Sequence, residues 1–340
     1  MSRVIYLLGA GASFGTRNES AIGPYEKYQT GVPIVKELGE AIDDYLRTFY
    51  QYPLTLEHDY HDDIEYPKLY QELSWLRDIC KNNITVDDYA KNLWSREQFT
   101  ELTRLKRVLA MFFSLIQSTE KRDKRYDPLI GILSRQGGQM NPDASILSWN
   151  YDRQVEFALH RYDMNSVSDT HQLKNNNISC KNLTTNYLNK DKFNLVKLNG
   201  TATFQSSNGN ILLEQRDINR SLFESQLSMK NPTLEVGLSF AWEEDPLFLE
   251  SILPLLSNTE ILVIIGYSLP DANYSVDQFL ISKMNNLKSI IIQDLFAQKR
   301  KNSLKELLNN DQLSRYKRGY ITIETRTDTS SFYIPKILKV

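Results

Sequence analysis

The feature that most constrains the fold is a series of short apolar runs, rich in β-branched residues, that alternate with helical patterns. The strongest run covers residues 260–268 (EILVIIGYS), and its unbroken apolar character predicts a strand that is buried on both faces of a parallel sheet. Further runs with strand character lie at residues 3–8, 144–149, 193–204, 287–294 and 320–325. Because helical patterns separate most of these runs, we predict right-handed βαβ units in an α/β fold with a mostly parallel sheet.

A long stretch without strand character separates the first two runs. Between residues 44 and 137, apolar side chains such as Leu102, Leu105 and Leu109 recur at helical spacing. We therefore predict that residues 1–340 form a single domain with a helical insertion at residues 44–137. The sheet-forming core would comprise residues 1–43, 138–204 and 251–340, with smaller excursions at residues 163–192 and 205–250.

The composition limits the partners and metal sites that the chain can have. Its 40 Lys and Arg residues nearly balance 42 Asp and Glu residues, so the overall charge does not indicate binding to nucleic acid. No apolar run is long enough to predict a membrane span. The two cysteines, Cys80 and Cys180, cannot form a four-cysteine zinc site and give no disulfide framework. Since no secretory signal pattern is visible, we expect a protein of the reducing cytoplasm.

The first run is followed by a glycine-rich turn, Gly9-Ala10-Gly11-Ala12-Ser13. Ligands of open α/β sheets bind at the carboxyl ends of the strands, where this turn lies. Glycines there allow the backbone to approach a pyrophosphate, and N–H groups at a helix start stabilise its charge. A plain tight turn is the alternative. The third glycine of the dinucleotide-binding fingerprint is absent, and no acidic residue is suitably placed to hold a ribose, which disfavours an ordinary dehydrogenase.

Polar residues follow the next two predicted strands as well. Asn150, Tyr151 and Asp152 come after the second run, where their side chains either face a ligand or cap the next helix. Asn199 and Gly200 lie within the third run. They either reach the same edge of the sheet or form the type I′ turn of a hairpin, for which Asn-Gly is well suited.

The last strands end in residues that suit a nucleotide. The turn Gly266-Tyr267-Ser268 closes the strongest run, and its small residues allow a ribose or a phosphate to approach. A simple strand-to-helix turn is the alternative, since a proline follows near the first helical position. Asp294 ends the next run, where its carboxylate either accepts a hydrogen bond from a ribose hydroxyl or caps a helix.

Taken in this order, the segments resemble the Sir2 (sirtuin-like) family, and more closely its bacterial branch of antiphage-defence NADases. In that branch a GAGAS turn opens the fold, and the later segments are G-[IVL]-P, an acidic IDDF-like element, T-x-N-Y-D, K-L-H-G and I-G-Y-S-L-P-D. This chain has GAGAS at residues 9–13, GVP at 31–33, VDDY at 86–89, SWNYD at 148–152, KLNG at 197–200 and IGYSLPD at 265–271.

The resemblance implies a Rossmann-like, Sir2-type fold with NAD as substrate or ligand. By this resemblance, residues 9–13 would cradle the phosphates. Asn150 would contact the nicotinamide ribose and orient the attacking water, and Asp152 would hold the nicotinamide carboxamide. Ser268 and Asp294 would lie near the adenosine ribose. The remaining residues expected at the NAD site are Tyr151, Gly200 and Gly266.

Two departures from the family pattern affect the expected activity. Family deacetylases carry a four-cysteine zinc module, so with two cysteines neither zinc nor protein deacylation is expected. Asn199 stands where the family has the histidine of L-H-G, which acts as a base toward a ribose hydroxyl. An amide cannot accept a proton near pH 7. The histidines of the chain all lie outside this motif: His58, His61, His160 and His171.

The resemblance therefore implies an NAD glycohydrolase that releases nicotinamide and ADP-ribose, with Asn150, Asp152 and Asn199 as catalytic residues, and that depletes NAD in antiphage defence. The alternative is a catalytically weak or inactive module that binds NAD or an ADP-ribose-type nucleotide as a sensor or scaffold. The family also implies a homo-oligomer, or a separate ATPase or nuclease as partner. We expect no membrane association and no direct binding to nucleic acid.

Overall fold

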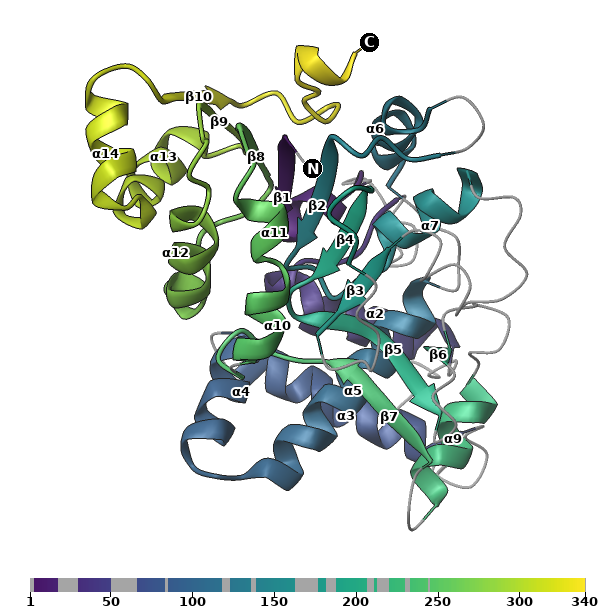
Figure 1. Ribbon diagram of the computed structural model, residues 1–340. Helices are drawn as coiled ribbons and strands as arrows, with labels where there is room; N and C mark the ends of the chain where they lie inside the picture. Colours follow the sequence, from purple (N-terminus) through teal and green to yellow (C-terminus); the bar gives the residue numbers. More distant parts are fainter. Residues whose placement is uncertain are drawn as a thin grey trace. The chain divides into compact units, whose positions relative to one another are not determined.

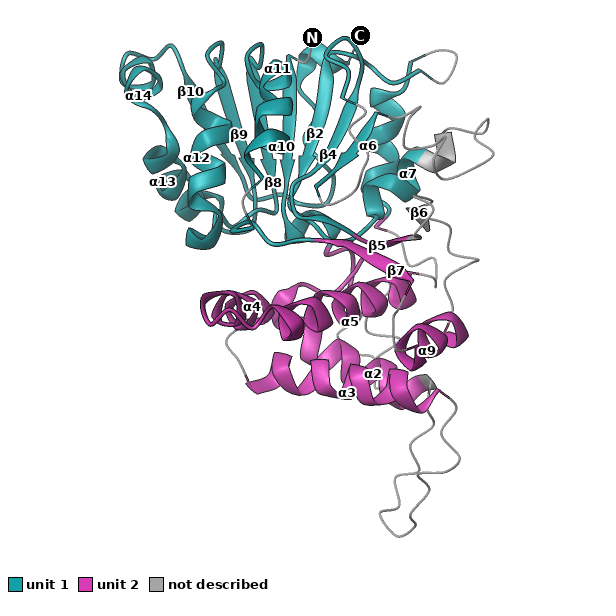
Figure 2. Ribbon diagram, turned by 60° about the horizontal axis from the view of Figure 1, so that its bottom comes forward, with its two compact units in different colours: residues 1–13, 124–201, 239–340 teal, residues 14–123, 202–238 magenta. Residues whose placement is uncertain are grey.

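The described part of the chain forms two compact units. The computed structural model describes residues 3–17, 30–49, 66–82, 85–117, 123–135, 139–162, 177–181, 188–206, 211–212, 220–229, 233–243 and 245–339. Unit 1 comprises residues 1–13, 124–201 and 239–340, and unit 2 comprises residues 14–123 and 202–238 (Figure 2). All the candidate site residues belong to unit 1.

Unit 1 is built on a parallel sheet that has seven strands within the described ranges, in the order β10-β9-β8-β1-β2-β4-β3 (Figure 1). All neighbouring strands in this sheet run parallel. The predicted α/β fold with a parallel, Rossmann-like sheet is therefore confirmed. The strands are β1 (Val4–Leu8), β2 (Ala144–Ser148), β3 (Ile178–Cys180), β4 (Asn194–Lys197), β8 (Ile261–Ile265), β9 (Ser289–Gln293) and β10 (Thr322–Arg326).

The order of the strands reverses at β1. The chain first adds β2, β3 and β4 on one side of β1, with β4 between β2 and β3, and then returns to add β8, β9 and β10 on the other side. In such sheets the crevice for a ligand lies beyond the carboxyl ends of the two strands at the reversal, which here are β1 and β8. The glycine-rich turn at residues 9–13 follows β1, and Gly266 follows β8.

One face of this sheet packs against helices through a continuous apolar core. Alternate strand residues, such as Leu262 and Ile264 of β8, share this core with side chains of α10 to α13. Val263, which lies between them, is equally buried, so β8 is buried on both faces as predicted. In the described ranges, the α-helices of unit 1 are α6 (Tyr126–Leu133), α7 (Gln154–Tyr162), α10 (Pro246–Ser251), α11 (Leu253–Leu256), α12 (Tyr274–Ser282), α13 (Ala297–Leu307) and α14 (Asn310–Lys317).

The run at residues 193–204 is not one strand. Its first part is β4 of the parallel sheet, whereas β5 (Gly200–Ser206) belongs to a second sheet. Since β4 and β5 do not pair, the hairpin alternative for Asn199 and Gly200 is wrong. Gly200 has a φ of +66°, in the left-handed region that favours glycine, and this conformation lets the chain leave the parallel sheet within one turn.

Unit 2 combines helices with a small sheet of the order β6-β5-β7. Leu102, Leu105 and Leu109 of α5 are buried, as their helical spacing predicted. The VDDY segment begins α4, where the side chain of Thr85 accepts a hydrogen bond from the backbone N–H of Asp88. Besides β5, the α-helices and strands of unit 2 in the part of the chain that the structure describes are α2 (Leu38–Phe49), α3 (Pro67–Asn82), α4 (Val86–Ser95), α5 (Phe99–Gln117), α9 (Arg220–Ser228), β6 (Ile211–Leu212) and β7 (Leu234–Leu238).

The boundaries between the two units differ from the ends of the helical insertion that we predicted at residues 44–137. Residues 30–43, which we assigned to the sheet-forming core, belong to unit 2, and α6, which we assigned to the insertion, belongs to unit 1. Helical spacing alone does not show which unit a helix joins. Across the described residues, no helix combines the length and the apolar character that crossing a membrane requires.

Candidate functional site

The glycine-rich turn after β1 is bonded to the turn after β8. Residues Ala10–Ser13 form a short 3-10 helix directly beyond β1. The backbone N–H of Gly9 donates to the carbonyl of Ile265 at 3.0 Å, and that of Gly11 donates to the carbonyl of Gly266 at 2.8 Å. The two motifs that the sequence suggested for a nucleotide therefore meet at the reversal point of the sheet.

The glycines at this contact are explained by the protein itself. A Cβ atom on Gly9 would lie 2.5 Å from the Cα atom of Tyr267, and one on Gly11 would lie 2.8 Å from the Cα atom of Gly266. Gly266 has a φ of +56°, and a Cβ atom there would meet the backbone nitrogen of Ala12. From their place after a strand, we expected these glycines to serve the approach of a ligand. The structure gives a further reason, which is the close contact between two backbone turns.

Ser13 connects the glycine-rich turn to the polar residues after β2. Its hydroxyl accepts a hydrogen bond from Asn150 Nδ2 at 3.0 Å and lies 2.9 Å from the hydroxyl of Tyr126. It also bonds to the carboxyl group of Asp152. A serine hydroxyl has one donor and two acceptor positions, so these three contacts use all of them. Ser13, Asn150 and Asp152, which sequence reasoning placed at one site, are thus joined by hydrogen bonds.

Asp152 lies in a buried position at the start of α7. One carboxylate oxygen accepts a hydrogen bond from the backbone N–H of Gln154 at 3.0 Å, which satisfies a donor of the first helical turn. Burial raises the pKa of the Asp152 carboxyl above its ordinary value, and the nearby ammonium group of Lys197 opposes this shift. The carboxyl group of Asp152 therefore bonds to the start of α7, as the helix-capping alternative predicted, and it also bonds to Ser13.

Lys197 is a buried cation that contacts this cluster at Asp152. We predicted no role for Lys197 from the sequence. Its side chain is 0% exposed, its ammonium group donates to the backbone carbonyl of Asp152, and it lies 3.2 Å from Oε1 of Glu156. A buried charge is tolerated when it is paired and hydrogen-bonded. The ion pair with Glu156 supplies this pairing and fixes the turn that carries Asn150 and Asp152.

Asn199 lies next to this cluster with an unsatisfied acceptor. The residue is 6% exposed, and its Nδ2 donates to the backbone carbonyl of Trp149 at 3.3 Å. Its side-chain oxygen has no hydrogen-bond partner among the described residues. Because buried polar atoms in native proteins nearly always have a partner, this oxygen is a position where a donor on a ligand would fit. Gly200 follows directly and turns the chain away.

The residues expected near the adenosine ribose lie along the neighbouring strand ends. Gly266 donates its backbone N–H to the carbonyl of Gln293 at 2.9 Å, which brings the turns after β8 and β9 together. Ser268 is exposed. Asp294 accepts a hydrogen bond from the backbone N–H of Phe296 at 2.7 Å, and its carboxylate lies 3.8 Å from Arg300 Nε. This bond closes a turn before α13, whose N-cap is Phe296, so the Asp294 side chain does not cap the helix.

A second buried carboxylate, Asp277 of α12, escaped the sequence analysis. It accepts hydrogen bonds from Trp149 Nε1 at 3.0 Å and from the hydroxyl of Tyr267 at 2.7 Å. The Trp149 and Tyr267 rings stack with their centroids 6.1 Å apart. Burial raises the pKa of Asp277 to about 7, although both hydrogen bonds favour the ionised form. Asp277 therefore ties together the residues that follow β2 and β8.

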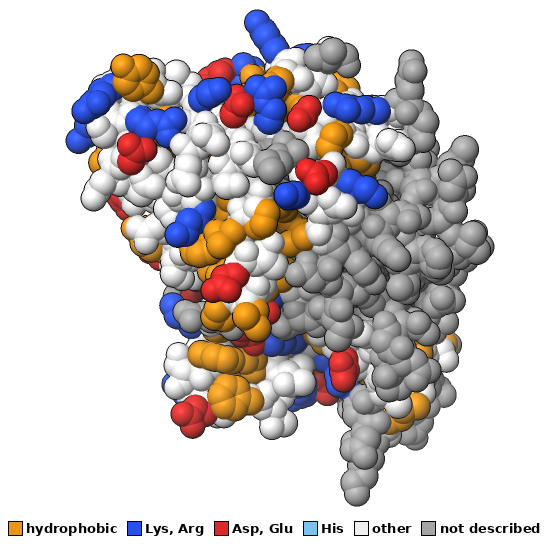
Figure 3. Space-filling view, in the orientation of Figure 1, with side chains coloured by type: hydrophobic (Ala, Val, Ile, Leu, Met, Phe, Trp, Pro, Cys, Tyr) orange, Lys and Arg blue, Asp and Glu red, His pale blue; other side chains and the backbone are white. Residues whose placement is uncertain are grey.

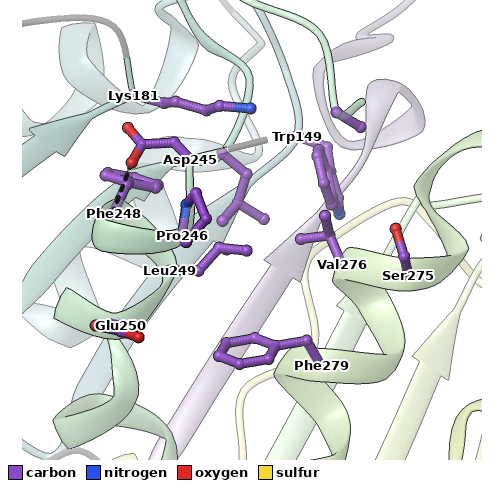
Figure 4. A pocket seen from close by; sticks show the side chains of 12 residues that line it. Trp149, Lys181, Asp245, Pro246, Phe248, Leu249, Glu250, Ser275, Val276 and Phe279 are labelled. Carbon is purple, nitrogen blue, oxygen red and sulfur yellow. Dashed lines mark hydrogen bonds between the residues drawn. The ribbon is translucent and has the colours of Figure 1, made fainter. Parts of the chain in front are cut away.

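A cavity of about 290 Å³ opens beside this network, between α10 and α12 (Figure 4). Trp149 and Leu198 line it, and these residues directly precede Asn150 and Asn199 in the chain. The polar cluster around Ser13 contributes no residue to its lining. Tyr151, the remaining residue expected at the NAD site, is buried and packs edge-on against Phe240. The side chains of His58, His61, His160 and His171 lie outside the described residues.

Neither a protein family nor a curated protein matches the chain.

Proposed function

We propose that the chain is an NAD glycohydrolase. The observation that carries this proposal is the hydrogen-bonded group of Ser13, Asn150 and Asp152, which lies at the carboxyl edge of a parallel sheet beside the glycine-rich turn. In the reaction, water attacks the C1′ atom of the nicotinamide ribose, and the bond from C1′ to the nicotinamide nitrogen breaks. The products are nicotinamide, ADP-ribose and one proton.

Asn150 and Asp152 have the chemistry that this step needs. The hydrogen bond from Asn150 Nδ2 to Ser13 sets the orientation of the amide, whose oxygen can then accept a hydrogen bond from water or a ribose hydroxyl. Asp152 offers a carboxyl group to the nicotinamide carboxamide. Holding water and substrate in a fixed geometry contributes a large part of the rate enhancement when the leaving group is already cationic.

The glycine-rich turn has a restricted role in this proposal. The N–H groups of Gly9, Gly11 and Ala12 already donate to carbonyl groups of the protein. Because glycine and alanine have small side chains or none, a pyrophosphate can approach the backbone of this turn at the exposed Ala10. Ser268 and Asp294 lie on the adjacent strand ends, where the adenosine ribose would be placed.

Asn199 limits the rate of NAD cleavage that we expect. Its unsatisfied oxygen can accept a hydrogen bond from a ribose hydroxyl, but an amide cannot remove the proton. General-base assistance is typically worth about 10² to 10⁴ in rate, so we expect slow turnover. The same observation favours a second candidate function, in which the chain binds NAD or an ADP-ribose-type nucleotide without cleaving it and acts as a sensor or scaffold.

Our proposal for the biological role rests only on the resemblance of the ordered motifs to those of the antiphage-defence NADases. We propose that NAD depletion by this chain serves antiphage defence in the cytoplasm. A homo-oligomer, or a complex with a separate ATPase or nuclease chain, would restrain the activity until infection. Mass photometry of the purified chain, with and without the products of neighbouring genes, tests this assembly.

The direct test is to incubate the full chain with NAD over a range of protein concentrations and to measure nicotinamide by chromatography. We expect release that Asn150→Ala and Asp152→Asn abolish, and about 10²-fold faster release in Asn199→His. Release equal to that of Asn150→Ala at every concentration would reject the glycohydrolase. Calorimetry would then decide the second candidate, which requires binding of NAD or ADP-ribose that leaves the ligand unchanged.

A further inference from the structure

The cavity between α10 and α12 has the size and the lining of a small-molecule site. Its apolar wall includes Trp149, Leu198, Phe248, Leu249, Val276 and Phe279. The cavity of about 290 Å³ is partly open to solvent, so a small molecule can enter it from solution. Dry apolar cavities of about 150 Å³ accept benzene. A volume about twice as large suits two fused rings.

Two side chains of opposite charge lie at one end of this cavity. Figure 4 shows Lys181 and Asp245 at the same end, with Phe279 at the other. Lys181 is buried, and its ammonium group donates to the carbonyl of Phe240 at 3.0 Å. Asp245 accepts a hydrogen bond from the backbone N–H of Phe248 at 2.9 Å. These backbone contacts fix both groups, and Glu250 is the third charged residue of the lining. Lys181 is a donor and Asp245 an acceptor, so this end suits a ligand that offers an acceptor beside a donor.

We propose that this cavity binds a neutral, bicyclic heteroaromatic molecule that carries an N–H donor beside a carbonyl acceptor. The rings lie between Leu249 and the side chains of Trp149 and Val276. The acceptor meets the ammonium group of Lys181, and the donor meets the carboxylate of Asp245. Hydrophobic side chains gather at the surface around α10 in Figure 3, so an apolar molecule reaches this part of unit 1 across apolar surface.

The site is connected to the candidate catalytic residues through the backbone. The carbonyl of Trp149 accepts the hydrogen bond from Asn199, and Leu198 directly precedes Asn199. A bound molecule contacts both Trp149 and Leu198 and therefore restricts the two strand ends that carry Asn150 and Asn199. This makes the cavity an effector site. The effector role rests on the proposed function, whereas the binding itself does not.

The test uses two probes, 2-quinolinone and indole, with the full chain. Both are bicyclic, but only 2-quinolinone has an acceptor beside its N–H group. Ligand-observed NMR and calorimetry give the affinities. Val276→Phe, which fills the cavity, should weaken both probes at least tenfold. Lys181→Met should weaken 2-quinolinone at least tenfold and indole less than threefold. Tyr320→Ala, at an exposed position, should change neither.

The proposal is overturned if neither probe binds the wild-type chain, or if Val276→Phe binds both as the wild type does. Circular dichroism shows whether that variant folds, and Phe279→Trp fills the cavity from the other wall if it does not. Asn150→Ala should retain the binding of both probes. Binding without any NAD cleavage would count against the proposed function alone, and NAD cleavage without binding would count against this site alone.

Discussion

Replacing Asp277 by asparagine should remove a large pH dependence from the stability of unit 1. Asp277 is buried against Trp149 and Tyr267, and burial raises the pKa of its carboxyl to about 7. The folded protein therefore holds a proton that the unfolded chain has released above its ordinary pKa. The stability from this group is greatest below pH 4 and is lost as the pH rises to about 7. Above that pH, the ionised carboxylate remains as a constant penalty.

The size of the effect follows from the difference between the two pKa values. A shift from 3.8 to about 7 corresponds to about 4 kcal/mol, at about 1.4 kcal/mol per pH unit. Between pH 5 and pH 8 the wild-type chain should lose about 3 kcal/mol of unfolding free energy through this group. The side-chain amide introduced by Asp277→Asn cannot titrate, so the variant should gain this amount relative to the wild type over the same interval.

Urea unfolding, followed by tryptophan fluorescence at several pH values from 5 to 8, measures this difference. The comparison uses wild type minus variant at each pH, which cancels the titration of all other groups. Asp311→Asn, at an exposed carboxylate of α14, is the matched control and should show no such trend. A difference between the wild type and Asp277→Asn that is constant from pH 5 to pH 8 would refute the reasoning.

The remaining predictions concern the glycine contact and the buried cluster. Gly9→Ala should lower the free energy of unfolding by about 3 kcal/mol, because the added methyl group meets backbone atoms. In the control Gly39→Ala the methyl group meets the flexible side chain of Lys81, so stability should change by about 1 kcal/mol or less. Thermal unfolding measures both changes. Lys197→Met should cost about 3 to 5 kcal/mol in urea unfolding, and adding Glu156→Leu should restore most of it. Ser13→Ala should cost about 1 to 3 kcal/mol and slow nicotinamide release, and an unchanged rate would contradict its orienting role.

The strands of the parallel sheet could be predicted where burial on both faces leaves an unbroken apolar run. This is why Ile261–Ile265 lies within the run at residues 260–268. The edge strand Ile178–Cys180 has three residues within a polar stretch and leaves no such signal. The break between β4 and β5 escaped prediction because strand propensity is the same in either sheet, and only the conformation of Gly200 separates them.

The candidate site was predictable only where residues follow a strand. Asn150 and Asp152 could be placed near Ser13 because parallel strands bring their carboxyl ends to one edge. Tyr126 could not, since the apolar pattern of α6 shows which face is buried and not where a hydroxyl points. Lys197 and Asp277 are charged residues in the core, and charge ordinarily indicates the surface. Their burial depends on partners that are distant in the sequence.

The contact between the turns after β1 and β8 restricts how this chain can vary. At Gly9, Gly11 and Gly266 the nearest atom that an added Cβ would meet belongs to backbone, and at Gly9 a ring carbon of Tyr267 lies almost as close. A clash with a side chain can be relieved by a smaller residue at the other position, but no substitution removes a main-chain atom. No second substitution can therefore compensate for the loss of one of these three glycines. Suppressor selections that start from Gly9→Ala should yield reversion to glycine more often than second-site changes.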